Sequence, residues 1–296
     1  WATVAQAWWE SPRAAYLGLG RGRLRPPPHG GPVARQTDGV TVDDLGYAVP
    51  LTSPIERVVS LVPSLTEALA VSASGLLVGA TDWCVHPVSL DVVRVRGTKN
   101  PDVPRIAALA PDLVVASMEE NREADVTALR ELGIPVWVTD IRTVDGALTS
   151  IERLLEIIEA PHRGWLAQAR EAWRDPVQVA GDSRLRVVVA IWRRPWMFLG
   201  SDTYAGDVLR RLGVDNVLAR SPWRYPRVDF DELPAHDLVV LPDEPYRFTP
   251  DDGPEAFPGA ATALVDGRAL TWYGPRMVQA PTLLAEQLGR STTDTC

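Results

Sequence analysis

The chain is predicted to be an α/β protein of two lobes, each a mainly parallel sheet flanked by helices, with a helical bridge joining the lobes. Two short strings in the first half, RVV at 57–59 and DLVV at 112–115, recur at 186–188 and 237–240, at offsets of 129 and 125 residues. Apolar runs alternate with helical patterns in both halves and lack period-two alternation, which indicates parallel sheets covered on both faces. Two similar lobes commonly hold a ligand where they face each other.

Residues 1–50 are expected to form a poorly ordered extension followed by a lead-in hairpin, because Pro and Gly interrupt them and no apolar period appears. The N-terminal lobe, 51–142, begins with a strand at 55–62, and Ser64 with Glu67 forms the capping-box pattern of a helix start. We expect the rest of this lobe to contain strands at 76–80, 112–116 and 136–138 and helices at 103–108 and 123–132.

The helical bridge is expected over residues 143–184 and the C-terminal lobe over 185–296. Apolar residues recur at helical steps between 143 and 158, and a second helix is predicted at about 163–174, bounded by Pro161 and Pro176. In the C-terminal lobe the sequence predicts strands at 187–191 and 238–241 and helices at 204–212 and about 278–288.

Composition excludes several classes of partner. The net charge is −8, and residues 1–42 hold five Arg against Glu10 and Asp38, so the remainder is still more acidic. Such a body is a poor binder of a phosphate backbone, and no nucleic-acid partner is expected. Cys84 and Cys296 are the two cysteines, which gives neither a disulfide framework nor a CxxC metal site. The chain has no run of roughly 18 apolar residues that could span a membrane.

Seven segments taken together resemble one family, the cobalamin- and siderophore-type solute-binding proteins of ABC importers, also called helical-backbone metal receptors. The likeness covers about residues 42–290 in order, and the cobalamin-binding branch is the most similar. The segments are SLVPSLTE at 60–67, GTKNPD at 97–102, PDLV at 111–114, ENRE at 120–123, IWRRPWM at 191–197, LPDEPY at 241–246 and LTWYGPR at 270–276.

This resemblance implies a fold like that of the class III periplasmic binding proteins and a monomer that performs no chemistry. Its ligand would be a corrinoid such as cobalamin, held in the interlobe cleft and delivered to an ABC permease in the membrane, so an extracytoplasmic location is implied. No cofactor besides the ligand is expected. The sequence has no recognisable signal-peptide pattern, which leaves a cytoplasmic location open. The family's long interlobe helix is expected to be shortened here, because 163–174 allows only about three turns.

A corrinoid is a broad, partly apolar disc, so we expect flat aromatic faces from both lobes around it. Trp83 follows a strand of the first lobe, and His86 lies three residues further along the same loop. Trp192 and Trp196 follow a strand of the second lobe, and at least one of the two is expected in the cleft. One residue of the pair Trp272 and Tyr273 is also expected there, because neighbours in extended chain point to opposite sides. In contrast, Trp137, Trp165 and Trp173 lie within strand or helix patterns and are expected to pack in the core.

Polar groups for the ligand's rim are predicted at Lys99 and Asn100, on a loop at the lip of the cleft, and at Arg276 after the last aromatic pair. Their donors suit amide, phosphate or carboxylate groups. No resident metal site is predicted, because the chain has four His and none pairs with a second ligand at a convincing spacing. Coordination of a ligand's metal by His86 is the less favoured alternative to lining the cleft.

In the resembled family, one acidic residue on the outer face of each lobe docks the receptor to its permease. By motif position these residues are Glu123 and Asp202. Both also lie near predicted helix starts, where a carboxylate is favoured by the helix dipole without any partner.

Three other functions are compatible with the sequence. The same cleft could hold an iron-siderophore or haem, or the protein could be a cytoplasmic corrinoid carrier. A hydrolase on this scaffold would use Glu119 with Glu120, or Asp243 with Glu244, as acid and base. That alternative is disfavoured because adjacent carboxylates do not share a face and no nucleophile motif such as GxSxG accompanies them.

Overall fold

The computed structural model describes residues 41–179 and 184–293, so the predicted extension at 1–40 lies outside the described residues. The described chain opens with a tight turn in which Val42 bridges Ala48. Asp44 then pairs with Arg153 at 2.7 Å, which fastens this lead-in segment to the first lobe. No helix within the described ranges is long and apolar enough to cross a membrane.

The N-terminal lobe contains a sheet with the order β3-β2-β1-β6-β7, and every neighbouring pair is parallel. Strands β1, β6 and β7 are buried along their whole length, which is why they are continuous apolar runs in the sequence. The five strands are β1 (Val58–Ser60), β2 (Leu77–Ala80), β3 (Val93–Arg94), β6 (Leu113–Ser117) and β7 (Val136–Thr139).

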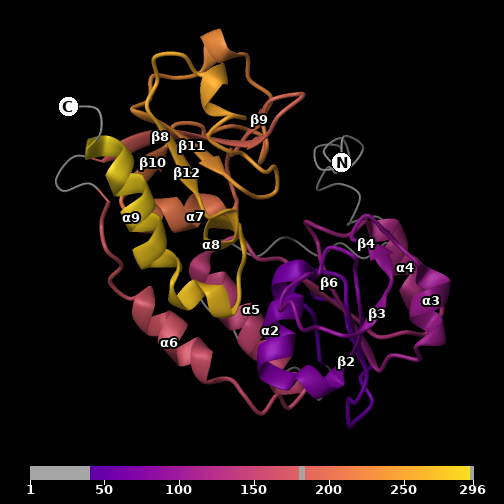
Figure 1. Ribbon diagram of the computed structural model, residues 1–296. Helices are drawn as coiled ribbons and strands as arrows, with labels where there is room; N and C mark the ends of the chain where they lie inside the picture. The colour runs from indigo at the N-terminus through magenta and orange to yellow at the C-terminus, as the bar shows by residue number, and fades with distance from the viewer. Residues whose placement is uncertain (1–40, 180–183, 294–296) are drawn as a thin grey trace, which may run out of the picture.

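Helices cover both faces of this sheet (Figure 1). On one face α2 (Pro63–Ala73) and α5 (Val144–Ile157) pack on Val58, Leu113 and Val115, whereas on the other α3 (Val103–Ala108) and α4 (Glu123–Glu131) pack on Val59 and Val114. A small antiparallel hairpin, β4 (Arg96–Gly97) with β5 (Asn100–Pro101), follows β3.

The predicted capping box at Ser64 and Glu67 is wrong. Helix α2 begins at Pro63 with Val62 as its N-cap, and no side chain caps it. Proline is favoured at the first helical position because its φ is already helical and its missing N–H has no intrahelical role there. Ser64 therefore lies inside the helix.

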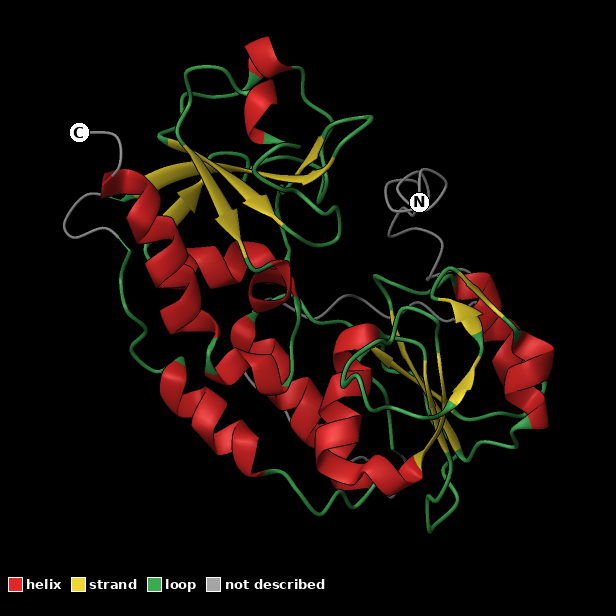
Figure 2. Cartoon of the chain, in the orientation of Figure 1, coloured by secondary structure: helices red, strands yellow, loops and turns green. Residues whose placement is uncertain are grey.

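The C-terminal lobe has the strand order β10-β8-β11-β12, again with parallel pairs, and β9 runs antiparallel beside β8. One face is covered by α7 (Tyr204–Arg211) and α9 (Ala280–Thr293), as Figure 2 shows, whereas loops and short turns cover the other. These loops supply Phe248 and Phe257 to a separate apolar cluster. The strands are β8 (Leu185–Trp192), β9 (Met197–Phe198), β10 (Val214–Asn216), β11 (Leu238–Pro242) and β12 (Thr262–Val265).

The bridge consists of α5 and α6 (Gly164–Ala172), the second of which spans nine residues. Two buried Trp side chains attach α6 to the rest of the protein. The indole N–H of Trp165 donates to Ser72 Oγ on α2 at 3.0 Å, and that of Trp173 donates to the Met277 carbonyl at 2.8 Å. One continuous apolar cluster runs from the N-terminal lobe through both bridge helices into the C-terminal lobe. Trp137, Trp165 and Trp173 are buried, as predicted, and the two-lobed α/β fold class is confirmed.

The segment after β9 fits closely under the loop at 223–226. The amide N–H of Gly200 donates to the Arg224 carbonyl at 2.7 Å. A Cβ atom on Gly200 would lie 2.1 Å from the Trp223 carbonyl oxygen, a distance that backbone atoms cannot accept without moving. Glycine is therefore required here by close approach, and it positions the loop that carries Tyr225.

We expect Gly200→Ala to lower the free energy of unfolding by about 1–3 kcal/mol, because the new methyl group must push the 223–226 loop away. Gly75→Ala is the matched control, since nothing lies within 4 Å of its added Cβ, and it should change stability by less than about 0.5 kcal/mol. Urea unfolding of the three proteins measures both values. Equal stability of the two variants would contradict the close fit.

Candidate functional site

A cavity of about 470 Å³ lies between the lobes, within the range of small-molecule sites. Its walls come from segments that follow the carboxyl ends of strands in both sheets, the place where open parallel sheets bind ligands. Trp83 follows β2 and Glu119 follows β6, whereas Trp192 ends β8 and Asp243 follows β11. The sheet topology thus brings residues of both lobes together around one cavity.

Four of the predicted ligand-binding residues line this cavity: Trp83, Trp192, Trp272 and Tyr273. Trp83 is 39% exposed and rests against the β4–β5 hairpin, where a Cβ on Gly97 would lie 3.2 Å from its Nε1 atom. Its ring therefore presents an accessible surface from the N-terminal lobe.

Trp272 and Tyr273 both line the cavity, and which of the two contacts a ligand stays a prediction. The segment that carries them runs directly across the seam between the lobes. The Tyr273 hydroxyl interacts with Ser117 and Ser64 of the N-terminal lobe, and the Tyr273 ring meets the buried Tyr204 ring edge-on at 5.6 Å. Burial raises the pKa of both phenols, so both are neutral hydrogen-bonding groups.

The second tryptophan after β8 lies elsewhere. Trp196 stacks on Phe248 at 5.8 Å and meets Phe257 at 5.2 Å, in the cluster that covers the loop side of the C-terminal sheet. Strand β9 reverses the chain antiparallel to β8, which carries Trp196 away from the cavity that Trp192 lines. Trp192 is therefore the member of the pair that lines the cavity, and Trp196 packs in the aromatic cluster.

His86 supports the wall of the cavity and does not line it. Its ring meets Trp272 edge-on at 5.8 Å, so it connects an N-terminal loop to the C-terminal lobe. Burial lowers the pKa of His86, and the nearby charges of Arg268 and Arg276 lower it further. No group of three or more His, Cys, Asp or Glu in the described part of the chain could hold a metal ion.

The three predicted rim donors also lie outside the lining. Lys99 is half-buried and its Nζ donates to the Glu119 carbonyl at 2.8 Å. Asn100 is exposed on the β4–β5 hairpin, and Arg276 lies 3.6 Å from Asp266.

The wall itself carries carboxylates that the sequence suggested only for a hydrolase. Glu119, Glu120, Asp243 and Glu244 line the cavity, and Arg247 is its one lining Lys or Arg among the residues that the structure describes. The pattern that identified Trp83 could have identified them too, because each pair lies within three residues of the end of a parallel strand. Tyr204 and Tyr225, which also line it, lie farther from any strand end and gave no such signal.

Burial governs the protonation of this wall. It raises the pKa of Glu119, although Arg224 and Lys99 oppose the shift, and it raises the pKa of Glu244. The pKa of Glu120 rises to about 7, with Glu119 and Glu244 adding to the effect of burial and Lys99 opposing it. Glu120 and Glu244 come from different lobes, so these carboxylates repel each other across the cavity.

Two ion pairs connect the lobes beside the cavity. Arg224 of the C-terminal lobe lies 3.3 Å from Glu119. Arg142, after β7, pairs with Asp140 at 2.8 Å and also with Asp202. The carboxylate of Asp202 thus has a partner within the chain, although its side chain is 45% exposed.

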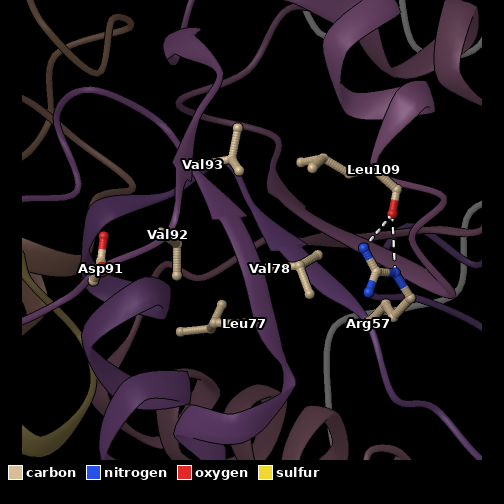
Figure 3. Close-up of a pocket in the computed structure, with 7 residues that line it drawn as sticks. All are labelled: Arg57, Leu77, Val78, Asp91, Val92, Val93 and Leu109. Atoms are coloured by element: carbon tan, nitrogen blue, oxygen red, sulfur yellow. Dashed lines mark hydrogen bonds between the residues drawn. The ribbon is translucent and has the colours of Figure 1, made fainter.

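A second depression lies at the outer edge of the N-terminal sheet, beside the edge strand β3 (Figure 3). Valine and leucine side chains form most of its wall. The Arg57 guanidinium in it already donates to the Leu109 carbonyl at 2.9 and 2.7 Å. It lacks the convergent polar and aromatic groups of the interlobe cavity.

Comparison with known proteins agrees with this architecture. A family model described as periplasmic binding protein matches residues 58–238. The vitamin B12-binding protein of Vibrio campbellii is 24% identical over 215 residues, which are 68% of this chain and 78% of that protein.

Two solved structures share the fold. The periplasmic vitamin B12-binding protein BtuF of Vibrio cholerae superimposes with a TM-score of 0.65 and 20% identity, covering 81% of this chain and 98% of its own. The periplasmic haem-binding protein RhuT of Roseiflexus gives 0.66 and 20%, covering 80% and 99%.

The raised pKa of Glu120 predicts that the ligand-free protein loses stability as pH rises. A carboxyl whose pKa is higher in the folded state than its ordinary 4.5 contributes stability that is complete below pH 4.5 and is lost as pH rises through about 7. Between pH 5 and 8, wild type should therefore lose on the order of 2 kcal/mol more than Glu120→Gln. Urea unfolding at four pH values measures this, with Glu56→Gln, at an exposed position, as the control. Parallel curves for wild type and Glu120→Gln would contradict the prediction.

Proposed function

The chain belongs to the periplasmic binding protein family, and on that premise we propose that it is the solute-binding receptor of an ABC importer and binds a corrinoid such as cobalamin between its lobes. Like its family, it works outside the cytoplasmic membrane. The observation that carries the proposal is the set of aromatic faces that meet in one cavity, Trp83 from one lobe and Trp192, Trp272 and Tyr273 from the other. Such faces suit a broad, partly apolar ring.

The sequence relatives favour a corrinoid over the alternatives. The relative described above is named for vitamin B12, whereas the haem-binding neighbour shares the fold at 20% identity, and that likeness concerns the fold alone. Because the family and this relative are binding proteins, the carboxylates of the cavity act in binding and not as the acid and base of a hydrolase.

Cyanocobalamin, haemin and a ferric siderophore should be titrated separately into the purified protein while tryptophan fluorescence is recorded. We expect saturable quenching by cyanocobalamin. Trp83→Ala and Trp272→Ala should each weaken its binding by about 1–3 kcal/mol, because each removes a flat face from the ring.

Trp196→Phe is the matched control for these two variants. It removes an indole that packs against Phe248 and Phe257 and should leave the affinity within about twofold of wild type, even where it lowers stability. Full affinity in both cavity variants, or no binding of cyanocobalamin by wild type, would reject the proposal.

The proposal extends to an ABC permease that receives the ligand, with Glu123 and Asp202 as docking residues. Glu123 is the first residue of α4, and Asp202 lies on the other lobe, beside the start of α7. The pairing of Asp202 with Arg142 means that docking at this position requires exchange of one arginine partner for another.

We expect Glu123→Gln and Asp202→Asn to keep wild-type cyanocobalamin affinity. Each should reduce receptor-stimulated ATP hydrolysis by the permease at least about fivefold, because a fivefold change corresponds to the loss of roughly 1 kcal/mol at one contact. Glu131→Gln, at the exposed end of α4, is the control. If Asp202→Asn changes only stability while ATP hydrolysis is unaffected, Asp202 serves the interlobe ion pair and not docking.

A further inference from the structure

Two buried polar atoms on the cavity wall lack any hydrogen-bond partner. Over residues 41–179 and 184–293 the unpartnered buried side-chain atoms are Glu119 Oε1, Tyr204 Oη and Trp137 Nε1, and the first two belong to residues that line the cavity. Tyr204 is 4% exposed. An unsatisfied buried polar group costs about 1–3 kcal/mol, so its presence in a binding cavity indicates a ligand atom that completes the bond.

The charges around the cavity are arranged in two layers. The carboxylates of Glu119, Glu120 and Glu244 face the cavity. The cations that offset them lie behind: Arg224 pairs with Glu119, Lys99 donates to the Glu119 carbonyl, and Arg268 lies over the Trp272 ring at 5.8 Å. These three cations do not line the cavity; Arg247 does, so at the contact surface a ligand meets several carboxylates and one guanidinium.

The wall extends across both lobes. Glu120 follows β6 and Glu244 follows β11, yet the charge of Glu244 contributes to the raised pKa of Glu120. The Glu244 carboxylate also accepts from the Trp272 indole, which holds it beside an aromatic face. A ligand stacked on Trp272 thus has its rim within reach of acceptors from two sides.

We propose that Glu119, Glu120 and Glu244 form an acceptor wall that selects ligands whose rim carries hydrogen-bond donors, such as primary amides, and rejects ligands rimmed by carboxylates. This inference rests on the proposed function and names the chemical class of its ligand. Amide N–H groups of a ligand can donate hydrogen bonds to these carboxylates, whereas a carboxylate on the ligand would bring like charges together in a partly buried site. A site built for one hydrogen-bonding pattern rejects an isostere that lacks it far more strongly than an apolar pocket does.

The test compares two corrinoids with the same ring and axial ligands that differ mainly at the rim, dicyanocobinamide with its amides and dicyanocobyrinic acid with free carboxylates, by titration at pH 7.5. Wild type should bind the amide form at least about 100-fold more tightly. In Glu120→Gln/Glu244→Gln this preference should narrow at least about tenfold, chiefly through tighter binding of the acid. The charge-matched control is Glu56→Gln/Glu131→Gln, at two exposed positions, which should keep the wild-type ratio.

Tyr204→Phe gives an independent readout should the double variant fail to fold. Since it removes an unpartnered hydroxyl, the melting temperature should stay equal or rise while cyanocobalamin affinity falls about fivefold or more. A fall in melting temperature with unchanged affinity would show that the hydroxyl has a structural role and takes no part in binding.

Three results would overturn the inference while leaving corrinoid binding intact. Wild type could bind the two corrinoids with equal affinity, the double variant could keep the wild-type affinity ratio, or the control variant could narrow that ratio as much as the double variant does. If neither corrinoid binds, the proposed function fails. The acceptor wall is then tested by comparing the affinity for haemin with the affinity for a haemin derivative whose propionates are amidated. Preference for the amidated porphyrin supports the acceptor wall; preference for haemin, or binding of neither porphyrin, overturns it.

Discussion

The attachment of α6 to both lobes is the constraint on which the site depends. Its two tryptophans are buried, and their indole N–H groups bond to Ser72 on one side and to the Met277 carbonyl on the other. A buried indole without its hydrogen bond would be costly, so each bond fixes the helix at one definite position. The shortness of the bridge is therefore offset by contacts along its length, and the carboxyl ends of the two sheets are held toward one cavity.

The cavity combines two features that each lower the stability of the ligand-free protein. Exposed aromatic faces lose apolar contact, and partly buried carboxylates lose hydration, which raises the pKa values of Glu119, Glu120 and Glu244. Under the proposed function, both losses are recovered when a ring with a hydrogen-bonding rim binds. In this proposal the groups that destabilise the ligand-free protein provide the binding energy. Ion pairs between the lobes, such as Glu119 with Arg224, connect the two walls of the cavity.

Sequence predicted the sheets well because buried parallel strands such as β6 and β11 are unbroken apolar runs, and it predicted Trp83 and Trp192 because they follow such strands. It failed for Trp196, whose position depends on the antiparallel reversal at β9, a feature of two residues without a distinct pattern. The sequence did not identify the acceptor wall as a binding surface. Its properties depend on burial by residues distant in the sequence and on whether each charged side chain lines the cavity or lies behind the lining residues. Lys99 and Glu119 are 20 residues apart in sequence, and spacing alone does not show that the amine lies behind the carboxylate.

The central claim is that a corrinoid lies between the lobes with its ring on aromatic faces and its rim on the carboxylates. A crystal structure of the protein with bound cyanocobalamin tests this most directly. We expect the ring against Trp83 and Trp272, with primary amides within about 3.2 Å of the carboxylates of Glu120 and Glu244. A corrinoid seated outside the interlobe cavity, or one whose amides turn away from both carboxylates, would contradict it.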